Sequence, residues 1–236
     1  MISLKNPIML ALDVDSDQQA FALLDQVGGV VGAIKIGPRL NLKYGAKFIE
    51  KASKYAPVFI DNKYFDITST VLASVQASFD SGASFVTVHA LNGLETLKEL
   101  AILEKKLNDV RPFKILCVTI LTSWSQENFP KNFKSLSVQD HVVALSQLVL
   151  NSGLSGLVCS GHELSLLRLI DQSKLLFKVV PGIRIEEDLA DNKQEQKRVM
   201  TPPEAMIEGA QALVIGRSIL GAKDPRQTVQ KILESI

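Results

Sequence analysis

The sequence predicts an α/β protein of the (β/α)8 barrel type, and three observations support this. One unit recurs along the chain: a short apolar run, a polar residue at its end, and a longer stretch with helical spacing. The apolar runs are continuous rather than alternating, which is typical of parallel strands covered by helices on both faces. Eight such units in 236 residues match the size of a closed barrel.

The eight expected strands follow one another without a linker or a break in composition, so we expect one domain over residues 1–236. An open doubly wound sheet is the structural alternative. It is disfavoured because the chain has neither a GxGxxG turn after the first strand nor a GxxxxGK[ST] loop. The expected strands are Ile8 to Leu12, Gly32 to Ile36, Val58 to Ile60, Phe85 to Val88, Ile115 to Leu121, Gly156 to Cys159, Phe177 to Val180, and Ala212 to Ile215.

Polar residues end or follow every expected strand, which is where enzymes of this fold place their active sites. A random surface would not place polar groups so regularly. The sequence therefore predicts one site at the C-terminal end of the barrel. In chain order the residues are Asp13, Lys35, Asp61 with Lys63, His89, Thr122 with Ser123, Ser160, Arg184 and Arg217.

Composition excludes several classes of protein. The 26 basic and 25 acidic residues are interspersed and give a net charge of +1, so no basic field exists to attract nucleic acid or an anionic membrane. We find no signal peptide and no apolar run of about 18 residues, so we expect neither secretion nor a membrane span. Cys117 and Cys159 lie in apolar runs without CxxC spacing, which indicates reduced core thiols in a cytoplasmic protein.

The segment from Phe59 to Thr70 holds the densest group of candidate catalytic residues. Side chains two apart on a strand point to the same face, so Asp61 and Lys63 should project together while Asn62 points away. Taken alone, the pair could be an ordinary ion pair, contributing roughly 0–1 kcal/mol if exposed. Asp66 stands where the chain enters a helix, and taken alone it indicates an N-cap.

The last two expected strands end in a pattern typical of phosphate binding. Barrels commonly bind phosphate in the loops after strands seven and eight, through backbone amides and the start of a short helix. Gly182-Ile183-Arg184 and Gly216-Arg217-Ser218 fit this, because glycine lets an anion approach the backbone and arginine can fork onto phosphate oxygens. The polar stretch from Glu186 to Arg198 is typical of a loop that can close over a ligand, although a solvated loop would look similar.

The chain also contains eight short blocks in a fixed order. They are Leu10-Ala11-Leu12-Asp13, Lys35-Ile36-Gly37, Asp61-x-Lys63-x-x-Asp66-Ile67-x-x-Thr70, Val88-His89-Ala90, Leu121-Thr122-Ser123, Pro181-Gly182-Ile183-Arg184, Gln196-Lys197-Arg198-Val199 and Ile215-Gly216-Arg217-Ser218. With these blocks the chain resembles the orotidine 5′-phosphate decarboxylase family, in its bacterial single-function form, over essentially its whole length.

The resemblance implies decarboxylation of orotidine 5′-phosphate to UMP, the last step of pyrimidine nucleotide synthesis, with no metal and no cofactor. It further implies a homodimer with shared sites, in which Lys35, Asp61 and Lys63 form a charged network that the partner subunit's Asp66 completes. Under this resemblance Asp66 is a catalytic residue rather than an N-cap. The residues implied to complete the neighbouring site are Asp66, Ile67 and Thr70.

By the same resemblance, Lys63 donates a proton to C6 of the pyrimidine and Asp61 lies against the departing carboxylate. Two opposite charges ~4 Å apart at an effective dielectric near 20 attract by about 4 kcal/mol, so an alternating array can keep every member ionised despite burial. The implied substrate contacts are Asp13, Lys35 and the partner's Thr70 at the ribose, Thr122 at the pyrimidine, Gln196, Gly216 and Arg217 at the phosphate with Arg184 near the mouth of the site, and Ile67 and Pro181 elsewhere.

Two other functions are weighed against this one. A magnesium-dependent sister enzyme, such as 3-keto-L-gulonate 6-phosphate decarboxylase, shares Asp61, Lys63 and Asp66, but it places a metal-binding glutamate at the end of strand two. Lys35 stands there in this chain, and an ammonium repels magnesium. A catalytically silent sensor of phosphate ligands would need the phosphate arm but not Lys63. Both alternatives are therefore disfavoured.

Overall fold

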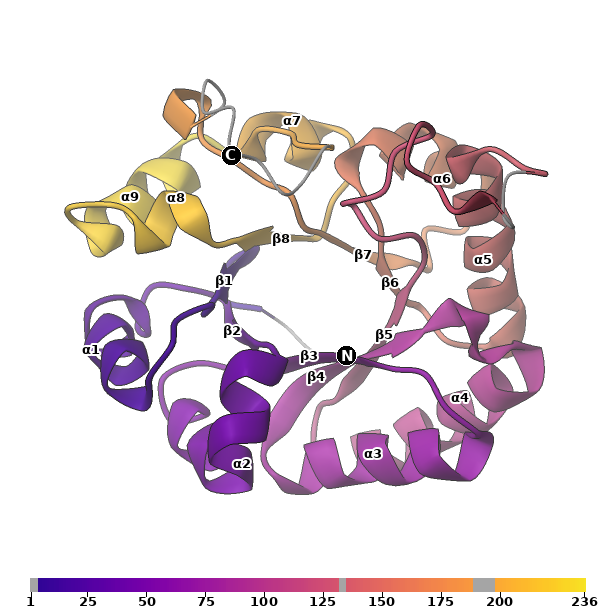
Figure 1. Cartoon of the computed structure of the whole chain (residues 1–236), viewed down its shortest axis with the longest axis horizontal. Helices are drawn as coiled ribbons and strands as arrows, with labels where there is room; N and C mark the ends of the chain where they lie inside the picture. The colour runs from indigo at the N-terminus through magenta and orange to yellow at the C-terminus, as the bar shows by residue number, and fades with distance from the viewer. Residues whose placement is uncertain (1–3, 132–134, 189–197) are drawn as a thin grey trace.

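The computed structural model describes residues 4–131, 135–188 and 198–236, and these form a closed barrel of parallel strands. Each strand pairs with the next one along the chain, and β8 pairs with β1 to close the ring. Figure 1 shows the strands at the centre with the helices around them. The strands are β1 (Ile8–Ala11), β2 (Ala33–Ile36), β3 (Val58–Tyr64), β4 (Ala83–His89), β5 (Lys114–Val118), β6 (Gly156–Val158), β7 (Phe177–Val180) and β8 (Ala212–Ile215).

Helical segments connect successive strands. The α-helices within the described ranges are α1 (Asp17–Val27), α2 (Pro38–Ala52), α3 (Thr68–Asp80), α4 (Leu94–Asn108), α5 (Val138–Ser152), α6 (Leu164–Ile170), α7 (Pro202–Ile207), α8 (Arg217–Leu220) and α9 (Pro225–Glu234). Short 3₁₀ turns occur at η1 (Ala90–Asn92), η3 (Gly161–Glu163) and η4 (Glu186–Asp188).

Several helices begin where the sequence offers a capping side chain or a proline. The Ser16 hydroxyl accepts the N–H of Gln19 at the start of α1. Ser137 and Asp140 form a reciprocal capping box at the start of α5. Helices α2, α7 and α9 each have proline in the first turn, where its missing N–H costs nothing.

The predicted (β/α)8 architecture is confirmed, and closure of the ring rules out the open doubly wound sheet. Two strand ends differ from the ends of the apolar runs by three residues or more, and the others by two at most. Strand β3 continues past Ile60, because after a shift in register Tyr64 pairs with Val88 of β4. Strand β5 ends at Val118, where its pairing with Val158 of β6 ends, although the apolar run continues to Leu121.

The core has two layers, as barrels of this kind require. An inner cluster fills the barrel; it includes Met9, Phe59, Phe85 and Leu116. A larger outer cluster lies between the strands and the helices. Within the parts of the chain that the structure describes, no helix has the length and apolarity needed to cross a bilayer.

Candidate active site

A cavity of about 620 Å³ lies at the C-terminal ends of the strands. Most of the site residues predicted from the sequence line it, although they come from different strand ends and from positions far apart in the chain. The strand ends that carry these residues therefore share one cavity, but His89, Ser123 and Ser160, which were predicted with them, do not line it. The predicted residues that line the cavity are Asp13, Lys35, Asp61, Lys63, Thr122, Pro181, Arg184, Gly216 and Arg217.

Four of these side chains form a chain of alternating charge. Lys35 Nζ lies 3.2 Å from Asp13 Oδ1 and 3.7 Å from Asp61 Oδ2. Lys63 Nζ lies 2.9 Å from the other carboxylate oxygen of Asp61. Lys35 and Asp61 are mostly buried, whereas Lys63 is 39% exposed. The array therefore runs from Asp13 to Lys63 along one wall of the cavity, with its last ammonium reaching the open space.

The charges of this array keep Asp61 ionised. Burial raises the pKa of the Asp61 carboxyl, but Lys63, Lys35 and hydrogen bonds from Lys63 and Thr87 outweigh it and hold the pKa below its ordinary value. The lowered pKa means that the folded state favours the carboxylate. Asp61 thus contributes stability above the ordinary carboxyl pKa, and this contribution is lost as the pH falls through the lower pKa of the folded state.

Lys63 has an unusual backbone conformation for a strand residue. Its φ is 51°, in the left-handed region that residues with side chains rarely adopt. This left-handed conformation lies within the register shift between Ile60 and Tyr64. Asp61 and Lys63 still reach the same cavity, as predicted, while Asn62 donates to the Tyr64 hydroxyl at 3.0 Å and does not line the cavity.

Thr87 on β4 holds this strained segment in place, and sequence reasoning missed it. Its buried hydroxyl donates to Asp61 Oδ1 at 2.9 Å and accepts the backbone N–H of Lys63, also at 2.9 Å. One side chain therefore fixes both the carboxylate and the backbone of the lysine. The available signal was a lone polar residue inside the apolar run of β4, two positions from Phe85, which faces the barrel interior.

We expect Thr87→Val to weaken the array while keeping the shape of the side chain. It leaves the partly buried N–H of Lys63 without its acceptor, which should cost about 1–3 kcal/mol of unfolding free energy. Loss of the hydrogen bond should raise the pKa of Asp61, so the decline in activity on acidification should begin at a higher pH. Thr87→Ser is the control, because it keeps the hydroxyl. An unchanged acid limb in Thr87→Val would contradict this role.

A second part of the cavity wall is cationic. Arg184 and Arg217 both line it, after β7 and at the first residue of α8. Burial lowers the pKa of the Arg184 guanidinium, and the positive charge of Arg217 lowers it further, while Asp188 acts in the opposite direction. Gly182, between β7 and Arg184, has a φ of 80°, which glycine adopts without strain. Because the charge of Arg217 reaches Arg184 and both line the cavity, the two arginines form a suitable site for an anion.

Asp66, Ile67 and Thr70 do not line the cavity of their own chain. All three are exposed, and Ile67 is 70% exposed. The interpretation of Asp66 as the N-cap of α3 is wrong: the helix begins at Thr68, its N-cap is Ile67, and the Asp66 carboxylate accepts the adjacent N–H of Ile67, at 2.7 Å. These side chains are thus available to another molecule.

The other predicted residues lie as follows. His89 Nδ1 accepts the N–H of Leu91 at 3.2 Å, and burial together with the charge of Lys63 lowers the His89 pKa. Cys117 and Cys159 are buried and unbridged, and burial raises their pKa values, that of Cys159 to about 12, as expected for inert thiols. Gln196 lies outside the described residues. The described ranges hold no group of three or more His, Cys, Asp or Glu side chains arranged for a metal ion.

The fold and the cavity define a barrel enzyme with an array of lysine and aspartate side chains in its cavity wall. The sequence model of the orotidine 5′-phosphate decarboxylase / HUMPS family matches residues 6–232. The chain therefore belongs to this family, and like its named relatives it is a carboxy-lyase.

Individual relatives agree with this assignment. The chain is 35% identical over 230 residues to orotidine 5′-phosphate decarboxylase of Erythrobacter litoralis, covering 97% of this chain and 98% of that protein. It is also 35% identical to the enzyme of Vibrio vulnificus, with 97% of each chain covered. The crystal structure of orotidine 5′-phosphate decarboxylase from Lactobacillus acidophilus superposes with a TM-score of 0.83 at 29% identity, covering 98% of this chain and 99% of that one.

Proposed function

We propose that this protein decarboxylates orotidine 5′-phosphate to UMP in the cytoplasm, without metal or cofactor, and that Lys63 donates the proton to C6. The single observation that carries this proposal is the pairing of the Lys63 ammonium, which reaches the cavity, with the ionised Asp61 at 2.9 Å. Whole-length similarity to named orotidine 5′-phosphate decarboxylases supports the substrate.

The reaction breaks the bond between C6 and the carboxylate carbon and leaves its electron pair on C6. A fixed cation beside C6 stabilises that charge, and such preorganised electrostatic stabilisation usually contributes more to catalysis than any other single effect. Lys63 then gives C6 a proton, so carbon dioxide and UMP are the products. One carboxylate oxygen of Asp61 holds the Lys63 ammonium in place, and Lys35 balances the negative charge at the second oxygen.

We assign the remaining contacts by their position in the cavity. Asp13 and Lys35 would hold ribose hydroxyls, and Thr122, in the loop after β5, would meet the pyrimidine. The cationic wall would hold the phosphate through Arg217 and the backbone of Gly216, with Arg184 at its edge. A phosphate dianion there would relieve the mutual repulsion of the two guanidinium groups. Pro181 and Gln196 are further proposed substrate contacts.

We also propose a homodimer with shared sites. Asp66, Ile67 and Thr70 are exposed on their own chain and line no part of its cavity, and Phe65 beside them is 63% exposed. An apolar patch next to unused polar groups suits contact with a second copy of the chain. In that arrangement the partner's Asp66 would join the charged array, and the partner's Ile67 and Thr70 would touch the substrate.

The deciding experiment follows the absorbance of orotidine 5′-phosphate with purified protein in excess EDTA. Loss of the orotate absorbance with formation of UMP supports a decarboxylase that needs no metal. Activity that appears only when magnesium is restored, or no activity with a folded dimer, contradicts the proposal and favours the magnesium-dependent sister enzyme or the silent sensor. Lys35 argues against the sister enzyme, since its ammonium lies between Asp13 and Asp61, where it would repel a divalent cation.

We expect Arg217→Ala to act mainly on binding. Loss of a charge-assisted hydrogen bond to phosphate should raise KM about 10- to 100-fold, with a smaller fall in kcat. Steady-state kinetics with orotidine 5′-phosphate measure both constants. Arg226→Ala is a matched control, because Arg226 lies exposed on α9 and outside the cavity. A fall in kcat alone, with KM unchanged, would contradict a phosphate contact.

A further inference from the structure

The loop after β5 presents Thr122 to the cavity from a tight turn. The carbonyl of Leu121 accepts the N–H of Trp124 at 3.0 Å, which places Thr122 and Ser123 at the two central positions of the turn. Neither residue belongs to a helix or a strand. Their position therefore depends on hydrogen bonds, which include the one that Asn128 Nδ2 donates to the Ser123 carbonyl at 3.2 Å and those that the Leu121 carbonyl accepts.

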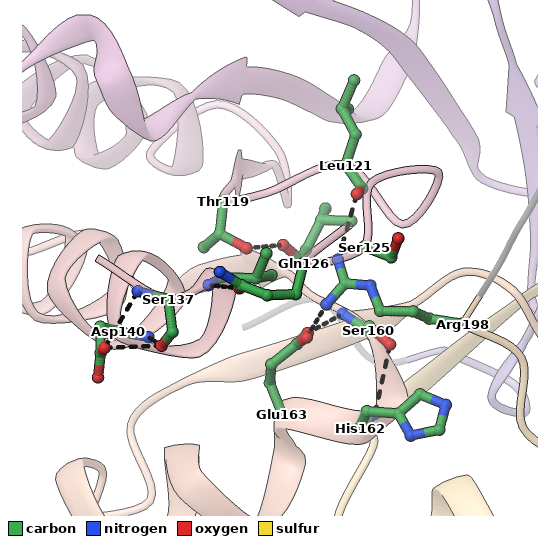
Figure 2. Close-up of polar contacts among 12 residues, drawn as sticks. Thr119, Leu121, Ser125, Gln126, Ser137, Asp140, Ser160, His162, Glu163 and Arg198 are labelled. Atoms are coloured by element: carbon green, nitrogen blue, oxygen red, sulfur yellow. Dashed lines mark hydrogen bonds and ion pairs between the residues drawn. The ribbon is translucent and has the colours of Figure 1, made fainter. Parts of the chain in front are cut away.

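Arg198 holds that carbonyl from the other side. Its Nη2 donates to the Leu121 carbonyl at 3.2 Å, while its Nη1 pairs with Glu163 Oε1. Figure 2 shows the guanidinium lying between the Leu121 loop and the η3 turn that carries Glu163. Because the guanidinium is a planar fork, one side chain can bridge two segments that follow different strands.

Glu163 is a fixed anchor for this bridge. It is 2% exposed, and its second carboxylate oxygen accepts the N–H of Ser160 at 2.8 Å. A buried carboxylate is costly unless it is paired and hydrogen-bonded, so Glu163 holds the Arg198 guanidinium firmly. The second arm of the guanidinium is then directed at Leu121.

The two residues after Arg198, Val199 and Met200, also contact neighbouring segments. The carbonyl of Val199 lies 3.2 Å from His162 Nε2. Met200 packs against Gly161 so closely that a Cβ at residue 161 would lie 2.6 Å from the Met200 sulfur. Met200 also forms a bridge with Ile183 after β7. The segment from Arg198 to Met200 thus links the ends of β5, β6 and β7.

We propose that Arg198 is a positioning residue, which fixes the turn from Leu121 to Trp124 and so sets the place of Thr122 in the cavity. The consequence for turnover rests on the function proposed above, but the consequence for the turn does not. Arg198 itself does not line the cavity, so its effect on the substrate would be transmitted through the Leu121 carbonyl.

The chain provides its own reporter for this proposal. Trp124 is the single tryptophan of the sequence, and it packs edge-on against Phe129 with 5.6 Å between ring centroids. The variants are Arg198→Met, Arg198→Lys and the double variant Arg198→Met with Glu163→Gln. The double variant removes both charges of the buried pair but still deprives Leu121 of its donor. The control is Glu104→Gln, which removes a mostly buried pair with Lys114 at the opposite end of β5.

We expect increased quenching of Trp124 fluorescence by acrylamide in Arg198→Met and in the double variant, with kcat/KM reduced about 10- to 100-fold at a temperature where each is folded. Arg198→Lys should give an intermediate result, because an ammonium cannot bridge Glu163 and Leu121 as a fork does. Glu104→Gln should lower the melting temperature without changing quenching or kcat/KM. If Arg198→Met does not fold, the double variant carries the test.

If the double variant shows the quenching and the kcat/KM of the wild type, the proposal is overturned. Arg198 and Glu163 would then be needed only to neutralise each other's charge. The other failure concerns the proposed function. If quenching of Trp124 increases in the variants but the wild-type protein does not turn over orotidine 5′-phosphate, the positioning role stands and the proposed function is refuted. The two failures are therefore distinguishable.

Discussion

Lys63→Ala is expected to abolish turnover of orotidine 5′-phosphate while leaving UMP binding measurable. Removing the proton donor and the fixed cation beside C6 together should lower kcat by about 10⁴-fold or more. The product carries no charge at C6, so its affinity should change far less, by about 10-fold at most. Single-turnover kinetics and calorimetric titration with UMP measure the two quantities.

The variant also has an electrostatic consequence. Lys63 is the larger of the two lysine influences that lower the pKa of Asp61, so its loss should move that pKa upward. Arg217→Ala provides the contrasting pattern, with weaker binding and a smaller change in kcat. Turnover in Lys63→Ala within about 10-fold of the wild type would refute the assigned mechanism.

The sequence predicted the barrel well because its signal is local and repeated. Each apolar run is continuous, since helices cover one face of each strand and the barrel interior the other, and most runs end near a polar residue that reaches the cavity. Asp61 and Lys63 could be paired from their spacing alone, and they lie 2.9 Å apart.

The errors occur where a long-range contact decides the local structure. The spacing of Asp61 and Lys63 already placed them on β3, but the register shift before Tyr64 comes with its pairing to Val88 of β4. The left-handed backbone of Lys63 depends on the hydroxyl of Thr87, 24 residues away. The turn after β5 is also reached from far along the chain, because the Leu121 carbonyl accepts from Arg198, 77 residues away.

Asp66 illustrates a different kind of limit. Its position before a helix made an N-cap reasonable, but α3 begins one residue too late for that, and the carboxylate is exposed. Periodicity within one chain contains no information about a second copy. The structure indicates a second copy only indirectly. Asp61 and Lys63 line the cavity, but the other three residues of the same family signature lie outside it.

The second prediction with a large effect concerns these residues. Asp66→Ala and Lys63→Ala should each be nearly inactive as pure proteins, yet a mixture refolded or co-expressed together should regain activity. In a mixed dimer, one site combines Lys63 from one chain with Asp66 from the other, and it is intact. Random assortment into two-fold dimers should therefore restore roughly a quarter of wild-type activity.

The matched control mixes Asp61→Asn with Lys63→Ala. Both side chains line the cavity of their own chain, so every site in that mixed dimer carries one defect and no activity should return. Recovery in the first mixture but not in the second requires that Asp66 acts across the subunit boundary. If Asp66→Ala is fully active as a pure protein, the exposed carboxylate of Asp66 has no catalytic part even if the protein is a dimer. If the pure variant is inactive and the first mixture does not recover, Asp66 acts within its own chain. Either outcome refutes the shared site.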